Sequence, residues 1–156
     1  MPRHDAPEKI LILHGPNLNL FGRREPHIYG STTLEQINER IRALAAKLEV
    51  QVTIVQSNHE GALIDAFHQH MDQAAGGIIN PGGLTQYSVS LHDCIKAMAF
   101  PVIEVHLSNL ATREEWRHHS IISPAVKGTV QGLGWRSYTA ALRTLVEIVR
   151  EPKKAS

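Results

Sequence analysis

Short apolar runs alternate with amphipathic stretches along the chain, and this alternation is the main structural signal in the sequence. Runs of four to six residues rich in Ile, Val and Leu predict buried strands at 9–14, 51–56, 76–80, 102–107 and 128–131. Buried strands that alternate with helices are typical of a parallel sheet covered on both faces.

The stretches between these runs carry helical periodicity. Thr33-x-x-Gln36 has the form of a capping box, and the apolar residues behind it recur at spacings of three and four: Leu34, Ile37, Ile41, Leu44 and Leu48. Further helices are predicted at 61–74, 88–99 and 137–150. The sequence therefore predicts an α/β fold, a flavodoxin-like three-layer sandwich with a five-stranded parallel sheet.

Composition narrows the class of protein. The 156 residues fit a single domain, with residues 1–8 and 151–156 expected to be flexible tails. Sixteen Lys and Arg against 15 Asp and Glu give a net charge of +1, which argues against nucleic acid or a membrane surface as partner. The N-terminus lacks the apolar core of a signal peptide, and the lone Cys94 cannot form an internal disulfide. We expect a cytoplasmic protein in which Cys94 is a buried, structural thiol.

Polar residues concentrate in three segments that directly follow predicted strands: HGPNLNLFGRREPHIYG, NPGGLTQYS and SNLATREEWRHHS. Ligands of open α/β sheets bind outside the carboxyl ends of the strands. We therefore expect the functional site where these three segments meet. The glycine fingerprint of a dinucleotide site and the phosphate loop of a nucleotide site are both absent from the sequence.

Two groups of residues in these segments carry candidate chemistry. Glu104 and His106 lie two apart in a predicted strand, so their side chains share one face near its carboxyl end. A carboxylate that orients an imidazole suits a general acid or base, although an incidental polar pair would have the same spacing. In the first loop, Arg23 or Arg24 close to Tyr29 would favour the phenolate and make Tyr29 a base.

Two other chemistries are less well supported. A zinc site could use His106, His118 and His119, but no Cys or acidic residue stands beside them at a ligand spacing, so we predict no metal. Lys127 could form an imine with a carbonyl substrate, but a solvated loop lysine explains it better.

Five separated segments resemble, in the same order, those of type II 3-dehydroquinate dehydratase: HGPNLNLFGRREPHIYGSTTLEQI, INPGGLTQYSVSLHDCI, VIEVHLSN, REEWRHHS and SPAVKGTVQGLGW. The resemblance extends from about Lys9 to Val149. It implies a flavodoxin-like fold and a homo-oligomer, a dodecamer built from trimers. It also implies dehydration of 3-dehydroquinate to 3-dehydroshikimate, in the shikimate pathway or in quinate breakdown, with neither a metal nor an organic cofactor.

The resemblance assigns catalytic roles by position. Tyr29 resembles the base, Arg24 the lid arginine beside it, and Asn17 the residue that holds a water at the developing enolate oxygen. His106, oriented by Glu104, resembles the acid that protonates the departing hydroxyl. These residue types suit the reaction, because a proton next to a ketone requires both a base and stabilisation of the enolate charge.

Other positions resemble substrate-binding residues. Asn80 resembles the residue that positions the departing hydroxyl, and the backbone N–H groups of Leu107 and Ser108, with the Ser108 hydroxyl, would hold the substrate carboxylate. Arg117 would contact substrate hydroxyls. Arg113 resembles a second arginine that closes the site, and Asp93 an acidic residue that reaches in from a neighbouring subunit.

Two positions depart from the pattern of the family. Gln86 stands where histidine is usual, and Ala111 where a histidine or another large side chain is common. These departures leave two alternatives to the dehydratase. One is a non-catalytic binding protein for a polyhydroxylated cyclic carboxylate, and the other is a related lyase acting on a neighbouring cyclic hydroxy acid.

Overall fold

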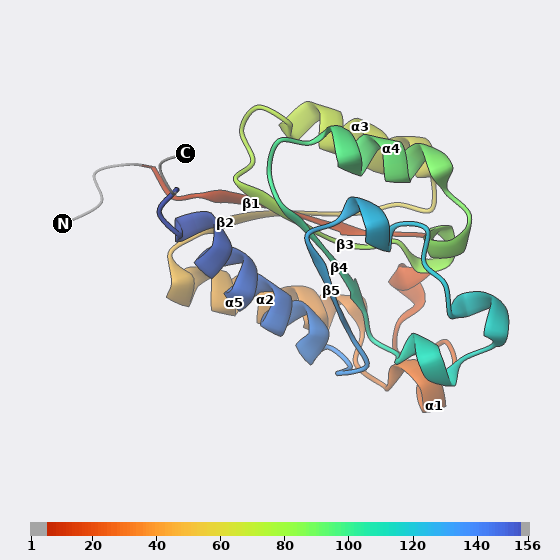
Figure 1. The fold of residues 1–156 in the computed structure, drawn as a ribbon. Helices are drawn as coiled ribbons and strands as arrows, with labels where there is room; N and C mark the ends of the chain where they lie inside the picture. The colour runs from red at the N-terminus through yellow and green to blue at the C-terminus, as the bar shows by residue number, and fades with distance from the viewer. Residues whose placement is uncertain (1–5, 154–156) are drawn as a thin grey trace.

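The computed structural model describes residues 6–153, and within them five strands form one parallel sheet in the order β2-β1-β3-β4-β5 (Figure 1). The strands are β1 (Lys9–His14), β2 (Gln51–Gln56), β3 (Gly76–Asn80), β4 (Val102–His106) and β5 (Gly128–Gln131). The predicted α/β sandwich is confirmed. Only the strand predicted at 102–107 is shorter, because the carbonyl of Leu107 accepts a bond from Gly134 in the loop that follows β5.

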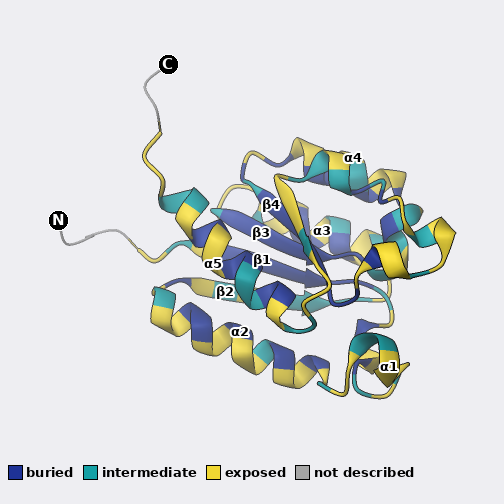
Figure 2. Ribbon diagram, turned by 60° about the horizontal axis from the view of Figure 1, so that its bottom comes forward, coloured by how far each residue is buried: buried dark blue, intermediate teal, exposed yellow. Residues whose placement is uncertain are grey.

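Two pairs of helices cover the two faces of the sheet (Figure 1). Helices α2 (Leu34–Leu48) and α5 (Arg136–Arg150) pack on one face, and α3 (Glu60–His70) and α4 (Val89–Ala97) pack on the other. The central strands β1, β3 and β4 are therefore buried almost throughout, whereas the edge strands β2 and β5 are partly exposed (Figure 2). Two apolar cores result, one on each side of the sheet.

The start of α2 follows its sequence signal. The Thr33 hydroxyl accepts a bond from the Gln36 N–H (3.2 Å), and the Gln36 side-chain oxygen accepts one from the Thr33 N–H (2.9 Å). This reciprocal capping box satisfies two N–H groups that a helix start leaves without partners. Helices α3 and α4 end before the predicted residues 74 and 99, because turns leading into β3 and β4 take over after His70 and Ala97.

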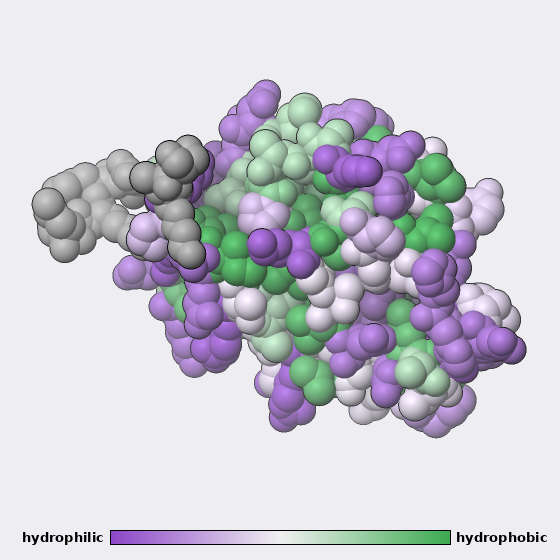
Figure 3. Space-filling model, viewed as in Figure 1, coloured by the Kyte–Doolittle hydropathy of each residue, from purple (hydrophilic) through white to green (hydrophobic). Residues whose placement is uncertain are grey.

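Short elements follow the carboxyl ends of the strands. They are α1 (Pro26–Tyr29) and the 3-10 helices η1 (Leu18–Leu20), η2 (Gly82–Gln86), η3 (Leu110–Thr112), η4 (Glu115–Arg117) and η5 (Ser123–Ala125). On the surface shown in Figure 3, hydrophilic residues gather at the lower right, the region that α1 and the loop after β4 occupy in Figure 1. Hydrophilic side chains are therefore exposed at the carboxyl edge of the sheet, as they are on other parts of this face.

The loops after β1 and β3 are in direct contact. The Gly15 N–H donates to the carbonyl of Asn80 (2.8 Å), and a Cβ at Gly15 would overlap the carbonyl oxygen of Pro81. Gly82 adopts a φ of 57°, a left-handed conformation that favours glycine. The two glycines allow the two loops to pack closely enough to share one site.

The ends of the described chain and its cysteine bear on other expectations. Glu8 accepts two hydrogen bonds from the Arg150 guanidinium, each 3.0 Å, which join the start of β1 to the end of α5. Residues 1–5 and 154–156 of the predicted tails lie outside the described residues.

Cys94 is buried on α4, as expected, and burial raises the pKa of its thiol to about 11. Within residues 6–153, no helix combines the length and apolar character that crossing a membrane requires.

His14, the last residue of β1, is a polar group inside the core next to α2 and α5. Its side chain is fully buried and bonds Asn38 through Nε2 (2.8 Å) and the Tyr138 hydroxyl through Nδ1 (2.8 Å). Burial lowers the pKa of His14 from 6.5 to about 4, because desolvation outweighs the opposing effect of the Asn38 hydrogen bond. The imidazole is therefore neutral near pH 7.

This depressed pKa predicts a loss of stability in mild acid. Between about pH 6.5 and pH 4 the unfolded chain protonates His14 while the folded protein does not, so the free energy of unfolding falls as the pH falls. The full pKa difference corresponds to about 3 kcal/mol. Urea unfolding at several pH values would measure the slope, and His14→Gln, which has no titrating group, should show a shallower one. Equal slopes in the two proteins would contradict the prediction.

Candidate functional site

A cavity of about 200 Å³, here called the inner cleft, opens at the carboxyl edge of the sheet. It lies between the loops that follow β1, β3 and β4. All but two of the predicted site residues line it, namely Asn17, Arg24, Tyr29, Asn80, Gln86, His106, Leu107, Ser108, Arg113 and Arg117. Glu104 lies directly behind His106, whereas Asp93 is exposed on α4, away from the inner cleft. The structure thus brings together residues as far apart in the chain as Asn17 and Arg117.

Glu104 and His106 form the pair that their spacing on β4 predicts. The His106 Nε2 lies 2.5 Å from a carboxylate oxygen of Glu104, and both side chains are buried. Because a carboxylate accepts, Nε2 is the donor in this bond. The imidazole has no other hydrogen-bonding partner among residues 6–153, and its ring lines the inner cleft. The arrangement orients one histidine toward a small polar cavity, as a general acid or base requires.

Two serines hold the buried Glu104 carboxylate. The Ser123 hydroxyl donates to one carboxylate oxygen (2.7 Å), and the Ser120 hydroxyl lies 3.0 and 3.2 Å from the two oxygens. The Ser120 oxygen in turn accepts the N–H groups of Ile122 and Ser123. A buried charge is costly unless such donors surround it. The sequence reasoning missed both serines; the buried carboxylate implied donors, but not which residues would supply them.

Tyr29, at the end of α1, lies beside two guanidinium groups. The central carbon of Arg24 is 5.3 Å from the Tyr29 ring centroid, and that of Arg113 is 5.1 Å away. Phe21 packs against the same ring, with centroids 5.6 Å apart. The sequence reasoning placed Arg23 or Arg24 next to this phenol. Arg23 is exposed and does not line the inner cleft, and Arg113, from the loop after β4, is the second cation.

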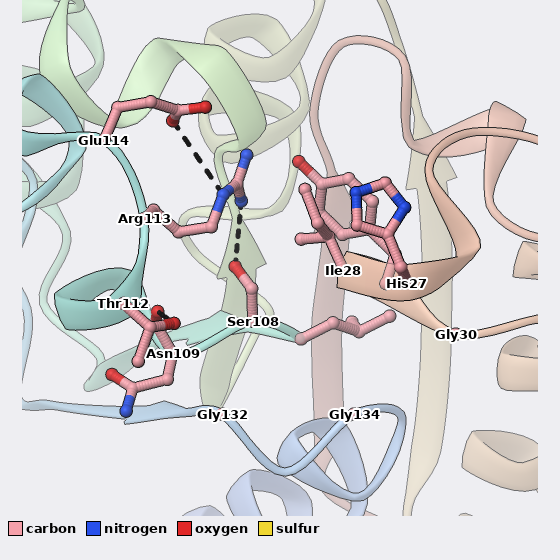
Figure 4. A pocket seen from close by; sticks show the side chains of 12 residues that line it. His27, Ile28, Gly30, Ser108, Asn109, Thr112, Arg113, Glu114, Gly132 and Gly134 are labelled. Atoms are coloured by element: carbon pink, nitrogen blue, oxygen red, sulfur yellow. Dashed lines mark hydrogen bonds and ion pairs between the residues drawn. The ribbon is translucent and has the colours of Figure 1, made fainter.

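Arg113 also separates the inner cleft from a second, wider groove of about 660 Å³. Its Nη1 donates to the Ser108 hydroxyl (3.0 Å), and its Nε lies 3.9 Å from a Glu114 oxygen. Figure 4 shows the arginine side chain between these two partners, with His27 and Ile28 on the facing side. The Arg113 side chain is only 6% exposed. Because it lines the inner cleft, a ligand bound there would lie next to its positive charge.

Asn17 has an unusual backbone conformation that a neighbour supports. Its φ is 69°, and its N–H donates to the Asn58 side-chain oxygen (2.9 Å). The Gln56 amide also donates to Asn58 and to the carbonyl of Gly15, each at 3.2 Å. Asn58 was not predicted as a site residue, since a single polar residue after a strand gives no local signal. These bonds fix the loop from which Asn17 reaches the inner cleft.

Gln86, the departure from the family pattern, has one satisfied and one free polar atom. Its Nε2 donates to the carbonyl of Arg117 (3.0 Å), while its buried Oε1 has no partner among residues 6–153. A buried acceptor without a partner is costly, so a ligand hydroxyl in the inner cleft would be a favourable donor to it. Also within residues 6–153, no three His, Cys, Asp or Glu side chains gather as a metal ion would require.

The two bonds from Ser120 to Glu104 lead to a test. Ser120→Ala removes a donor to a buried carboxylate and the acceptor for two backbone N–H groups, so we expect it to lower the free energy of unfolding by about 2 kcal/mol. Ser57→Ala is the matched control, because the Ser57 hydroxyl accepts a similar bond from the His59 N–H (3.0 Å) but donates to no carboxylate among residues 6–153. Urea unfolding of both variants should give a clearly smaller loss for Ser57→Ala. Equal losses would show that the carboxylate contact contributes nothing.

Comparison with known proteins places this geometry in a family. The family described as "Dehydroquinase class II" matches residues 8–146. The chain is 48% identical to a 3-dehydroquinate dehydratase of Halothermothrix orenii over 143 residues, which cover 92% of this chain and 97% of that protein. It is 51% identical over 140 residues to a 3-dehydroquinate dehydratase of Nostoc sp., covering 90% and 95% of the two chains.

A solved structure agrees with the sequence relatives. The type II dehydroquinase of Butyrivibrio crossotus superposes with a TM-score of 0.88 at 38% identity, over 90% of this chain and 99% of that one. The resemblance that the five sequence segments carry is therefore confirmed, and the chain belongs to the class II dehydroquinase family.

Proposed function

We propose that this protein dehydrates 3-dehydroquinate to 3-dehydroshikimate by anti elimination through an enolate. The observation that carries the proposal is that a phenol beside two guanidiniums and a carboxylate-oriented imidazole line the same small cavity. A base and an acid on one cavity are what the removal of a proton and a hydroxyl from neighbouring carbons requires. Membership of the family supports the choice of substrate.

In the first step, the Tyr29 oxygen removes a proton from C2, next to the C3 ketone. The positive charges of Arg24 and Arg113 stabilise the phenolate that accepts it. The electron pair of the broken C–H bond moves into the ring and places negative charge on the ketone oxygen. Asn17, held by Asn58, would fix a water that donates to this oxygen.

In the second step, the enolate re-forms the ketone and the C1 hydroxyl leaves. His106 donates the proton that turns this hydroxyl into water. The bond from Nε2 to Glu104 holds the imidazole in the orientation that this transfer requires. Asn80 lines the same cavity and positions the departing group. The net change is the loss of one water and the formation of a C1–C2 double bond conjugated with the ketone. No metal or organic cofactor enters this scheme.

The remaining residues bind the substrate. The backbone of Leu107 and Ser108, with the Ser108 hydroxyl, would hold the carboxylate, and the guanidinium of Arg113 already lies against that hydroxyl. Arg117 and the free Oε1 of Gln86 would contact the ring hydroxyls. A cytoplasmic location is part of the proposal, and the free thiol of Cys94 is compatible with a reducing compartment.

The conjugated product gives a direct assay of the proposed function. Addition of 3-dehydroquinate to the purified protein should raise the ultraviolet absorbance with saturation kinetics. Tyr29→Phe keeps the ring between its neighbours but removes the oxygen, so we expect kcat to fall by at least about 10²-fold with the fold intact. Near wild-type kcat in this variant would reject Tyr29 as the base.

The same assay separates the two alternatives. Saturable binding of 3-dehydroquinate without an absorbance change would identify a binding protein for polyhydroxylated cyclic carboxylates. Turnover of a neighbouring cyclic hydroxy acid in preference to 3-dehydroquinate would identify a related lyase. Gln86→His tests one of the departures from the family pattern that motivate the two alternatives. A change of about threefold to tenfold in kcat/KM is expected from one neutral hydrogen bond, and a gain of several hundredfold would favour the alternatives.

We further propose a dodecamer of trimers in which Asp93 of one subunit completes the site of its neighbour. Asp93 is exposed on α4, and Tyr87 and Val89 nearby are 76% and 64% exposed, so this end of the helix offers an apolar surface beside the carboxylate. Exposed apolar residues of this kind are typical of subunit contacts.

A mixing experiment tests the contribution of Asp93 across subunits. Tyr29→Phe and Asp93→Ala subunits, each of low activity alone, should regain activity after they are unfolded and refolded together, because mixed trimers contain sites with both native residues. Sedimentation would show whether the active species is the dodecamer. Absence of any regained activity, or a fully active monomer, would reject the proposal.

A further inference from the structure

A turn after η4 brings two hydroxyl groups to the Glu104 carboxylate. Ser120 and Ser123 lie in this turn, 16 and 19 positions after Glu104 in the chain. Neither serine lines the inner cleft, nor does Glu104, whereas His106 does. Any effect of the serines on a reaction in the cleft must therefore pass through Glu104 to His106.

The Ser120 hydroxyl can only donate to Glu104. Its oxygen accepts the N–H groups of Ile122 (3.1 Å) and Ser123 (3.0 Å), and a hydroxyl oxygen has two lone pairs. Both lone pairs are thus in use, and the O–H group is what remains for the carboxylate oxygens at 3.0 and 3.2 Å. The backbone of the turn therefore sets the direction of this bond.

The donors around Glu104 favour its ionised form. One carboxylate oxygen lies 2.5 Å from the His106 Nε2 and 3.0 Å from the Ser120 hydroxyl, and the other lies 2.7 Å from the Ser123 hydroxyl. A carboxylate accepts all of these bonds, whereas a carboxylic acid would replace one of the acceptors by an O–H group. Hydrogen bonds donated to a charged form stabilise that form.

The turn that carries the serines is anchored on both sides. The Ile121 N–H donates to the carbonyl of Thr85 in η2 (3.0 Å), and His92 on α4 donates through Nδ1 to the carbonyl of Ile121 (2.7 Å). Ile122 is fully buried in the core next to α3 and α4. The two hydroxyls are therefore held in place by contacts that do not involve Glu104.

The ionised Glu104 determines which nitrogen of His106 a ligand meets. Nε2 donates to the carboxylate, so Nδ1 is the nitrogen that remains for the inner cleft. Nδ1 carries a transferable proton when the ring is an imidazolium, and an adjacent carboxylate stabilises that cation. A neutral glutamic acid in the same place would not.

We propose that Ser120 and Ser123 are positioning residues that hold Glu104 as a carboxylate, so that His106 donates a proton from Nδ1 to the departing hydroxyl. The inference rests on the proposed function, in which His106 is the acid. In that step the C1–O bond breaks, its electron pair stays on the oxygen, and the Nδ1 proton completes a water molecule. His106 is left as a neutral imidazole that still donates to Glu104 through Nε2.

Ser123→Ala is the central test, because the Ser123 hydroxyl donates to Glu104 and has no other hydrogen bond among residues 6–153. We expect kcat for dehydration to fall about tenfold, the effect of one hydrogen bond to a charged group, with KM within about twofold of the wild type. Exchange of the C2 hydrogen with solvent, which needs Tyr29 but not His106, should fall less. The ratio of exchange to dehydration should therefore rise, and Ser123→Thr, which keeps the hydroxyl, should restore it.

Ser88→Ala is a matched control for a general loss of stability. The buried Ser88 hydroxyl also donates to a carboxylate, that of Glu60, and also accepts a backbone N–H, that of Leu91 (3.0 Å), but it does not line the inner cleft. We expect Ser88→Ala to lower the melting temperature at least as much as Ser123→Ala, while its ratio of exchange to dehydration stays within about twofold of the wild type. An equal rise in the two variants, or no rise in Ser123→Ala, would overturn the proposal.

His106→Ala separates a failure of this proposal from a failure of the proposed function. Absence of dehydration by the wild-type protein rejects the function itself. A raised ratio in His106→Ala with a wild-type ratio in Ser123→Ala leaves the function intact and rejects the role of the serines. If Ser123→Ala does not fold, Ser120→Ala removes the other hydroxyl donor and should raise the same ratio, and an unchanged ratio there would equally reject that role.

Discussion

The close packing of the loops after β1 and β3 is the constraint on which the inner cleft depends. Gly15 lies directly against Pro81 and donates to the carbonyl of Asn80, so two loops that are far apart in sequence share one backbone contact. Tyr29 and Asn17 come to the cleft from the first loop, and Asn80 and Gln86 from the second. A side chain at Gly15 would separate the loops and, with them, the residue proposed as the base from the residue proposed to position the leaving hydroxyl.

A second feature is the number of polar groups that the protein buries near this contact. Glu104, His14 and Asn80 are each at most 3% exposed, and the side chain of each has at least one hydrogen bond. Buried polar groups add little net stability, because the bonds mainly offset the loss of water. Their contribution is orientation: each bond removes an alternative rotamer or tautomer from a buried group at the carboxyl edge of the sheet.

The sequence predicts most of the fold because its signals are local. Strand positions follow from apolar runs, and the start of α2 from a motif of four residues. The site residues follow from the rule for parallel sheets together with the family resemblance, and the cavity gathers nearly all of them. The ends of α3 and α4 were predicted too late, because tertiary turns rather than periodicity set them. Ser120 and Tyr138 were missed as supporting residues since their partners lie 16 and 124 positions away.

The two groups proposed to act on the departing hydroxyl are anchored in different layers of the sandwich. Asn80 pairs in the sheet with His14, which bonds Tyr138 in the core beneath α2 and α5, while His106 is held through Glu104 and Ser120 from the side that α3 and α4 cover. A substitution that shifts the packing of one core would displace only the group on that face of the sheet. Core substitutions on opposite faces should therefore interact genetically, one compensating for the other, although no side chain connects them and the sheet alone lies between.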